Sequence, residues 1–527
     1  MNYPVWEVAF GAGLLIAAVA ILHVFVSHFA VGGGLFLVVT ERRARRNNDL
    51  ALLGWLKAHT KFFVLVTVVF GAISGVGIWF TIGLIGPTAT SNLIHAYVWG
   101  WAIEWVFFFV EITAALLYLY GWDKLEARIH EWFGWIYFIA AFASMMIING
   151  IITFMLTSGS WVKTHQFWQG FFNPTYFPSL AFRFAIALAL AGIYALITAS
   201  VQKDAALKVR LVRWSAWWIV PALALLPALG WWYIRWIPAD VWASARGPMP
   251  TATHYALFAV ILLAVTFALA LLTLVRPGRM RLAFSLLVAL VALGAMGSFE
   301  FVREAIRKPY VIAKYLYANS LYAAKIPGDG GFSGDEVNAT GILRAAKWIS
   351  NRDLSKGNQA AVGREIFRVE CESCHTIGAY RGVKRYLALR QWDENKMQTM
   401  LGVLDFMHHG VMPPFAGTDA ERGALAVYLS TVQPVVAAAA AAASDGQTVF
   451  DQNCSMCHWV KAGEPLFKDL PRDPNAATKA LGDLTSLFPL MPDLKLPEPQ
   501  RIALVQWINE QRSAKGFGKA AQGGNGK

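Results

Sequence analysis

The segment ILHVFVSHFAVGGGLFLVVTE, residues 21–41, is an almost continuous run of apolar side chains. A helix of about 20 apolar residues crosses a bilayer core of ~30 Å, so this segment predicts a membrane span. His23 lies inside the span as a candidate ligand, although a lone histidine in an apolar helix is often merely hydrogen-bonded to a neighbour. Gly32–Gly34 lie about three turns further on and predict a place where a flat macrocycle could approach the backbone.

Seven further apolar stretches follow. Of the 527 residues, 56% are hydrophobic and only 15% are charged, which is far too apolar for a soluble protein of this size. The N-terminus has no basic region and no small-residue cleavage site, so the first stretch is expected to remain a span. The eight expected spans are Trp6–Thr40, Trp55–Gly86, Ala96–Tyr120, Trp132–Leu156, Leu180–Val201, Trp214–Trp236, Tyr255–Val275 and Leu282–Phe301.

Basic residues mark every second connection between the spans. They are Arg42, Arg43, Arg45 and Arg46 after the first span, Lys124 and Arg128 after the third, Lys203, Lys208, Arg210 and Arg213 after the fifth, and Arg276, Arg279 and Arg281 after the seventh. Positively charged loops face the cytoplasm, so we expect both termini on the periplasmic side of a bacterial inner membrane. This topology also explains the net charge of +13, and we expect no nucleic-acid partner.

All four cysteines lie in the polar half beyond about residue 301. They form the motifs CESCH, with Cys371, Cys374 and His375, and CSMCH, with Cys454, Cys457 and His458. The pattern C-x-x-C-H is typical of covalent c-type haem attachment, in which two thiols form thioethers and the adjacent histidine ligates iron. A zinc half-site or a redox dithiol would also use C-x-x-C. Two copies, each with its histidine and on the side where haem is attached, predict two covalent haem c groups.

The two motifs belong to an internal repeat, because Cys371 and Cys454 are 83 positions apart in matching surroundings. Short helices that include 363–367 and 446–450 are expected before the motifs, and closing helices at 424–432 and 501–510 after them. Met412 and Met491, each followed by proline, are predicted as the sixth iron ligands, as in the small monohaem cytochrome c domains that this region resembles. His408 and His409 are competing ligands for the first iron.

These features predict an all-α fold, with an eight-span transmembrane helical bundle followed by two small cytochrome c-type helical domains. The expected parts are a membrane domain at 1–310, a linker at 311–350, the first cytochrome c domain at 351–434, a linker at 435–444, the second cytochrome c domain at 445–513 and a flexible tail at 514–527.

Ionisable residues are rare within the expected spans, and such residues are functional candidates. Glu104 and Glu111 lie seven positions apart, hence on one face of the third span, and predict a proton path or a position near a metal. Interhelical hydrogen bonds by protonated acids are the alternative. The segment 300–310, at the outer end of the eighth span, gathers acids and bases that an interfacial salt-bridge cluster would also explain.

Residues 15–155, and more weakly about 295–315, resemble the large subunit (subunit I) of cytochrome bd oxidases. The resemblance implies that His23 ligates a haem and that Glu111 takes the place of the second of two family acids near the haems. Glu104 corresponds to the first acid, although the spacing between the two acids is one residue shorter here than in the family. The segment REAIRKPY, residues 303–310, resembles a family stretch that holds a second haem. The resemblance implies that Glu304 ligates this haem and that Arg307 pairs with haem propionates, with Tyr310 in place of the family tryptophan.

The chain also departs from that family. The family holds a third, low-spin haem between a histidine in span five and a later methionine, beside a long outer loop that binds quinol. Here Arg183 stands in the histidine's place, span seven has no methionine and the loop 237–253 is short. The usual site of quinol oxidation is therefore expected to be missing, and Arg183 is left to pair with a haem propionate, an anionic lipid or a carboxylate.

The first hypothesis is a membrane-bound respiratory reductase. Electrons from a periplasmic cytochrome c or similar donor would pass through two haem c groups to a di-haem centre of b or d type, which His23 and Glu304 ligate. This centre would reduce O2 to water, and Glu104 and Glu111 would supply the protons. Nitric oxide or peroxide are alternative acceptors.

Two rival functions remain open. One is a non-catalytic conduit between quinones and periplasmic cytochromes, with extra ligands from His28, His95 and His254. The other is a chain that only anchors c-type haems. Besides membrane lipid, the resemblance implies a second membrane subunit or a homodimer.

Overall fold

The computed structural model describes residues 6–239, 241–242, 250–326, 329–347, 349–407, 410–434, 445–455, 457–458, 460, 464–484 and 496–515. The chain divides into two compact units. One, here the membrane unit, is Gly13–Gly330, and the other, here the polar unit, combines Met1–Ala12 with Gly331–Lys527.

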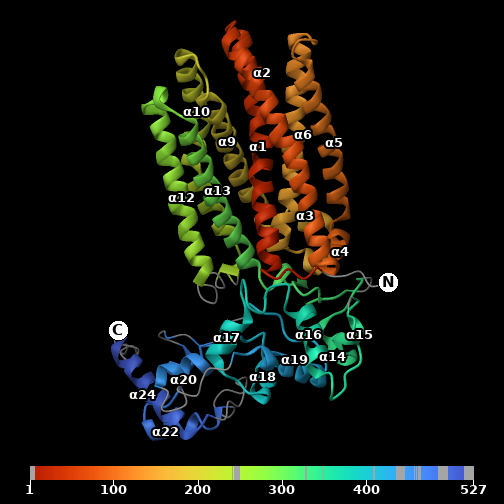
Figure 1. Ribbon diagram of the computed structural model, residues 1–527, viewed down its shortest axis with the longest axis vertical. Helices are drawn as coiled ribbons and strands as arrows, with labels where there is room; N and C mark the ends of the chain where they lie inside the picture. The colour runs from red at the N-terminus through yellow and green to blue at the C-terminus, as the bar shows by residue number, and fades with distance from the viewer. Residues whose placement is uncertain are drawn as a thin grey trace, which may run out of the picture. The chain divides into compact units, whose positions relative to one another are not determined.

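The membrane unit is a bundle of long helices (Figure 1). Within the described ranges, eight helical segments are long and apolar enough to cross a membrane, which confirms the expected number. They are α1 (Ala12–Arg46), the continuous α2, η1 and α3 (Leu50–Val64, Leu65–Phe70 and Gly71–Ile85), α5 (Val98–Gly121), α6 (Ala127–Leu156), α9 (Tyr176–Ser200), α10 (Ala205–Trp236), α12 (Pro250–Val275) and α13 (Leu282–Arg307). Shorter helices are α4 (Pro87–Ala96), α7 (Trp161–Thr164), α8 (Phe167–Phe171) and the 3-10 turn η2 (Pro277–Arg279).

The first helix begins later than the apolar pattern predicts. The Gly11 N–H donates to Val8 O (2.8 Å), and Gly11 has a φ of +113°, so a turn precedes Ala12. A positive φ suits glycine because a Cβ atom would clash with the backbone there. Apolar composition alone does not report such a turn.

Helix α9 lies at the centre of the membrane unit, packed against α6, α10 and α13. Its side chains are mostly buried and join the main hydrophobic core with those of α1 and α2. A helix that is apolar on all sides is expected in such a position.

Ion pairs between connections place several of the basic loops at one end of the bundle. Arg210, near the start of α10, contacts the Asp49 carboxylate before α2 (2.9 Å). Lys57 in α2 forms an ion pair with Asp123 after α5. The first pair joins the regions that follow the first and fifth spans, and the second joins the start of the second span to the connection after the third.

The polar unit repeats one helix pair. In the first copy α16 (Gln359–Glu370) packs on α19 (Asp419–Val432), and in the second α20 (Gly446–Asn453) packs on α24 (Glu498–Ala514). A Cβ atom at Gly363 or Gly446 would overlap a backbone carbonyl of the opposite helix, Ala424 or Ala503. The same close crossing thus occurs twice, as the sequence repeat predicts. The intervening helices are α17 (Val383–Arg390), α18 (Glu394–Leu401), α21 (Pro465–Lys468) and α22 (Pro474–Ala480).

The segment 311–350, expected as a linker, has structure of its own. Strands β1 (Tyr310–Ile312) and β2 (Leu316–Tyr317) form an antiparallel pair whose Ile312 and Leu316 are buried in the membrane unit. Helices α14 (Gly334–Thr340) and α15 (Ile342–Ala345) belong to the polar unit, where Glu421 of α19 accepts hydrogen bonds from the N–H groups of Ile342 and Leu343 (3.1 and 2.9 Å).

Candidate haem sites and buried ionisable groups

The first C-x-x-C-H motif directly follows α16. The His375 N–H donates to Cys371 O (2.9 Å), so the motif closes one tight turn that brings both thiols and the imidazole to the same loop. His375 Nδ1 lies 3.1 Å from Arg381 O. Because a carbonyl only accepts, Nδ1 carries the proton and Nε2 is the nitrogen suited to ligate iron.

The second motif repeats this geometry after α20. His458 Nδ1 lies 3.0 Å from Glu464 Oε1, a buried carboxylate that orients the ring. His458 Nε2 is buried and has no hydrogen-bond partner among the described residues. A buried polar atom without a partner is unfavourable unless a ligand satisfies it. This donor set fits a covalently attached haem whose iron takes Nε2.

The thiols of Cys371, Cys454 and Cys457 do not have the character of redox-active thiols. Burial raises the pKa of the Cys371 thiol well above its usual range, and it raises the pKa of Cys454 to about 12 and of Cys457 to about 11. Reactive redox cysteines have a lowered pKa, because the thiolate is the nucleophile. The surroundings therefore favour haem attachment over dithiol chemistry.

The predicted sixth ligands are described only in part. Met412 lies in the loop before α19 and is partly buried. Met491, His408 and His409 lie outside the described residues. Methionine ligation thus stays a prediction for both domains.

In the membrane unit, His23 faces the second span just after its π-helical turn η1. His23 Nδ1 lies 3.1 Å from Ser74 Oγ, and that hydroxyl donates its hydrogen to Phe70 O (2.8 Å). The hydroxyl therefore accepts from Nδ1–H, which leaves Nε2 with its lone pair for iron. A Cβ atom at Gly75 would lie 3.0 Å from the imidazole, so this glycine leaves room for the ring. The site fits a haem ligand at His23.

The expectation for Gly32–Gly34 is wrong. A Cβ atom at Gly32 would overlap the Ala187 carbonyl of α9, and Cβ atoms at the next two glycines would lie within 2.6 Å of Phe63 and 2.5 Å of Tyr137. The three glycines allow close helix packing, and protein rather than a macrocycle occupies that space.

Glu104 and Glu111 both face α6, as their spacing predicts. Ser144 Oγ donates to Glu104 Oε1, and Tyr137 Oη donates to Glu111 Oε1, each at 3.1 Å. The two carboxyl groups thus lie along one helix interface, each with a hydroxyl partner.

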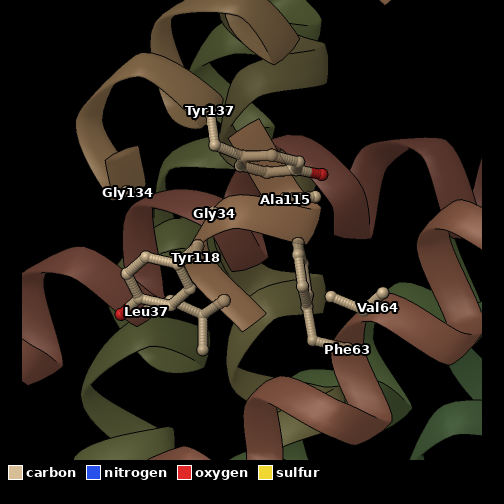
Figure 2. A pocket seen from close by; sticks show the side chains of 8 residues that line it. All are labelled: Gly34, Leu37, Phe63, Val64, Ala115, Tyr118, Gly134 and Tyr137. Atoms are coloured by element: carbon tan, nitrogen blue, oxygen red, sulfur yellow. The ribbon is translucent and has the colours of Figure 1, made fainter. Parts of the chain in front are cut away.

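Figure 2 shows a small pocket between α1, α2, α5 and α6. Tyr118 and Tyr137 supply the hydroxyl-bearing side chains of its lining, and the other lining residues are apolar or glycine. In the view their hydroxyl groups point to different sides, away from each other. The pocket separates the hydrogen-bonded group around Glu111 from a second buried group around Glu41.

The Glu41 group was not predicted from the sequence. Its carboxylate accepts from Tyr118 Oη (2.7 Å), His130 Nδ1 (2.8 Å) and Arg45 Nε (2.7 Å), and His130 Nε2 lies 2.8 Å from Tyr118 O. The side chains of Glu41 and His130 are fully buried. Both ring nitrogens of His130 therefore face acceptors, the Glu41 carboxylate at Nδ1 and the Tyr118 carbonyl at Nε2.

A second group of buried charges includes the unassigned Arg183. Arg183 Nη2 lies 3.2 Å from Glu300 Oε1, and Arg303 Nε lies 2.7 Å from Glu300 Oε2. Of the three partners considered for Arg183, a carboxylate is the one present. His28 lies in the electrostatic field of this group, and its buried Nε2 has no hydrogen-bond partner in the described ranges.

Glu304 and Arg307 are in direct contact. Arg307 Nη2 lies 2.6 Å from Glu304 Oε2, and Arg307 Nη1 donates to the carbonyls of Tyr310 and Val311 (3.0 and 2.8 Å). Lys308 Nζ also lies 3.2 Å from the Glu304 carboxylate. The salt-bridge cluster considered for this segment is present, and the predicted haem roles of both residues stay predictions.

Comparisons with known proteins agree with the two-part architecture. A family model described as cytochrome bd terminal oxidase subunit I matches residues 12–237, and one described as cytochrome c oxidase, cbb3-type, subunit III matches residues 358–429 and 441–508. A bd oxidase structure from Geobacillus thermodenitrificans is similar with a TM-score of 0.50 and 16% identity, over 57% of this chain and 88% of that chain. At this identity the likeness shows the fold alone. No curated protein matches the chain in a sequence comparison.

The membrane unit and the polar unit therefore carry distinct family signatures in one polypeptide. Both signatures belong to haem proteins of respiratory electron transfer. The chain thus joins a region similar to cytochrome bd oxidase subunit I to a C-terminal region similar to cbb3-type cytochrome c domains, and the two matches together support a respiratory haem oxidoreductase.

Proposed function

We propose that this chain is a cytochrome c-fed terminal reductase that passes electrons from a periplasmic donor through two c-type haems to a di-haem centre in the membrane unit. Dioxygen, reduced to water, is the proposed substrate. The b- or d-type haems supply the open iron and the redox chemistry, and the polypeptide supplies ligands, charge and protons.

The single observation that carries the electron route is the Arg183–Glu300 ion pair. Related large subunits hold a low-spin haem with a span-five histidine, and that haem receives electrons from quinol. Here that position is Arg183, whose side chain is 5% exposed and whose guanidinium pairs with Glu300. A side chain engaged in this way is no iron ligand, so the c-type haems are the natural electron input.

His23 is the proposed ligand of one membrane haem, because Ser74 fixes the tautomer that leaves Nε2 for iron. Glu304 is the proposed weak ligand of the other, and Arg307 would then turn from the Glu304 carboxylate toward a propionate. Weak carboxylate ligation favours an iron with a vacant position. Glu104 and Glu111 hold protons along the α5–α6 interface, each poised by a hydroxyl partner.

Spectroscopy of the purified protein tests this function. The reduced protein treated with CO should show a perturbed non-c haem, and a pyridine haemochrome assay should count two haem c beside b- or d-type haem. O2 consumption should be supported by reduced cytochrome c and not by quinol. H23A should lose non-c haem, whereas H95A, a matched change at an exposed histidine of α4, should retain it. No CO-reactive non-c haem in the wild-type protein would refute the reductase.

A second candidate, the six-coordinate electron conduit, is favoured by His28. Its Nδ1 lies 2.8 Å from Val24 O, which leaves the buried Nε2 available as an additional ligand. A conduit requires that non-c haem is present but insensitive to CO, so the same spectrum separates the two functions. H28A would then remove haem that the reductase does not require.

The proposed setting is the bacterial inner membrane, with both termini in the periplasm. That placement puts the polar unit on the side where c-type haems are attached and where soluble cytochromes deliver electrons. A second membrane subunit or a second copy of the chain is proposed as the partner within the bilayer.

A further inference from the structure

The two haem motifs differ in the group that contacts Nδ1 of the motif histidine. In the first motif, His375 Nδ1 lies 3.1 Å from the backbone carbonyl of Arg381, a neutral acceptor. In the second, His458 Nδ1 lies 3.0 Å from Oε1 of the Glu464 side chain. Both contacts fix the tautomer in which Nδ1–H donates and Nε2 is left for iron. The repeat thus keeps the orientation of the imidazole and changes the charge of its partner.

The contact in the second motif is shielded from solvent. Glu464 is 6% exposed and His458 is 8% exposed. Interactions between buried charges are screened much less than those at the surface. A hydrogen bond to an ionised carboxylate is also roughly twice as strong as one between neutral groups. The Nδ1–H bond of His458 is therefore polarised more strongly than that of His375.

The fold fixes the backbone that carries Glu464. Its carbonyl accepts from the N–H groups of Phe467 and Lys468 (2.9 and 2.8 Å), so Glu464 directly precedes α21. The Phe467 ring packs against Phe450 of α20 and Trp507 of α24, with ring centroids 5.9 and 6.1 Å apart. The carboxylate is thus anchored to the helix pair of its own domain and belongs to the core around the second motif.

A carboxylate at Nδ1 makes the imidazole a more basic ligand. Ferric iron carries one positive charge more than ferrous iron, so a more basic ligand and a nearby negative charge both stabilise the ferric state. The sixth ligand does not separate the two haems, because methionine is predicted for both domains. The partner of Nδ1 therefore distinguishes the second haem from the first.

Two cations near the second motif act in the opposite direction. Arg390 and Lys396 of the first domain contact the side chains on either side of Cys454. The Asp451 carboxylate attracts the Arg390 guanidinium and offsets part of its charge. These cations contact the attachment loop, whereas Glu464 is hydrogen-bonded to the ligand itself. The carboxylate therefore has the larger effect on the iron.

We propose that Glu464 lowers the reduction potential of the second haem c below that of the first, so that the second haem is the electron entry and the first is the exit. One electron then passes toward the higher potential, which takes the second haem from ferrous to ferric and the first from ferric to ferrous. The difference in potential needs only the two attached haems. The direction of transfer rests on the proposed function, because it assumes a periplasmic donor and an acceptor in the membrane unit.

A redox titration of single-haem forms of the full-length protein tests the order of the potentials. C371S/C374S attaches only the second haem c, and C454S/C457S attaches only the first. The c-haem bands report the potential in each protein. The second haem should titrate at the lower potential, and a second haem that titrates above the first would overturn the proposal.

The role of the carboxylate is tested in the C371S/C374S protein. E464Q keeps an acceptor for Nδ1 without the negative charge, so it should raise the potential by an equilibrium factor of about ten, equal to about 59 mV for one electron. D469N removes an acid of the same segment that is 47% exposed, and it should leave the potential unchanged.

An E464Q protein that retains its haem at an unchanged potential would reject this role for Glu464, as would a D469N protein shifted as much as E464Q. Should E464Q fail to retain haem, E464D decides, because it keeps the charge and withdraws it from Nδ1. Its potential should rise by less than tenfold in equilibrium, and an unchanged value would again reject the role. The titration does not depend on CO binding in the membrane unit, so this inference and the proposed function can fail separately.

Discussion

Arg183 and Glu300 form a buried ion pair between α9 and α13, with Nη2 and Oε1 3.2 Å apart and the two side chains 5% and 10% exposed. Glu300 is shared, because Arg303 binds its second oxygen at 2.7 Å. The three side chains therefore carry one negative and two positive charges. The carboxylate is the central member, since each arginine depends on it.

The first prediction follows from that count. E300Q leaves Arg183 without its carboxylate and leaves Arg303 with only the nearby Glu304, so it should destabilise the protein by about 3–5 kcal/mol, whereas R183L leaves the Glu300–Arg303 pair intact and should cost clearly less. Thermal unfolding of the purified variants in one detergent measures the difference. Equal losses in the two variants would show that Arg183 and Arg303 do not share Glu300 in this way.

Axial ligation in the first cytochrome c domain gives the second prediction. If Met412 ligates the first iron, M412H replaces a thioether with imidazole and should lower the potential of that haem while its covalent attachment persists. M407L, at a methionine that is 1% exposed in the same domain, is the matched control and should leave the potential unchanged. A redox titration compares the two. An M412H protein with the wild-type potential would point to His408 or His409 instead.

The third prediction concerns the group around Glu41. E41Q removes the anion from a fully buried His130 and should destabilise the membrane unit by about 3–5 kcal/mol. E131Q, one residue beyond His130, removes an anion that is 24% exposed and lies 3.5 Å from Arg42, so it should change stability by at most about 1 kcal/mol. Unfolding midpoints of the two variants provide the comparison, and similar midpoints would contradict a buried ion pair.

The sequence predicts the spans well because length and apolar composition decide membrane insertion locally. Likewise, the C-x-x-C-H pattern and the 83-residue repeat are local signals, and the repeated crossing at Gly363 and Gly446 agrees with them. The Glu41–His130 pair was missed because its members are 89 positions apart. The available signal was Glu41 itself, an acid at the end of the apolar run 21–41. Because arginines follow it directly, the pattern indicates a residue of the basic loop rather than a buried one.

Glycines were the residues most open to misinterpretation. The run Gly32–Gly34 could make room for either a bound macrocycle or a closely packed neighbouring helix. Only the position of Ala187 on α9 decides between these two interpretations. The partner of Arg183 was likewise undecided, since Glu300 is 117 positions away. In both cases the missing information is a contact between helices, which periodicity along one helix does not contain.

The last prediction concerns pH. Glu372 lies inside the first haem motif, and burial together with the nearby Glu7 carboxylate raises its pKa from 4.5 to about 7. The folded protein therefore favours the protonated acid, and this group's contribution to stability is lost as pH rises from about 4.5 through about 7. Deprotonation also places a negative charge beside the first haem, which favours ferric iron.

The potential of the first haem should accordingly fall as pH rises through about 7, by less than the ~59 mV that a tenfold change in equilibrium represents. E372Q should abolish this dependence, and E7Q should shift its midpoint to lower pH because the repulsion is removed. E394Q, at an exposed acid of α18, should leave the dependence unchanged. Potentials measured from pH 5.5 to 8.5 in the four proteins provide the test. If the E372Q protein retains the wild-type slope, another group near the haem, such as a propionate, carries the proton.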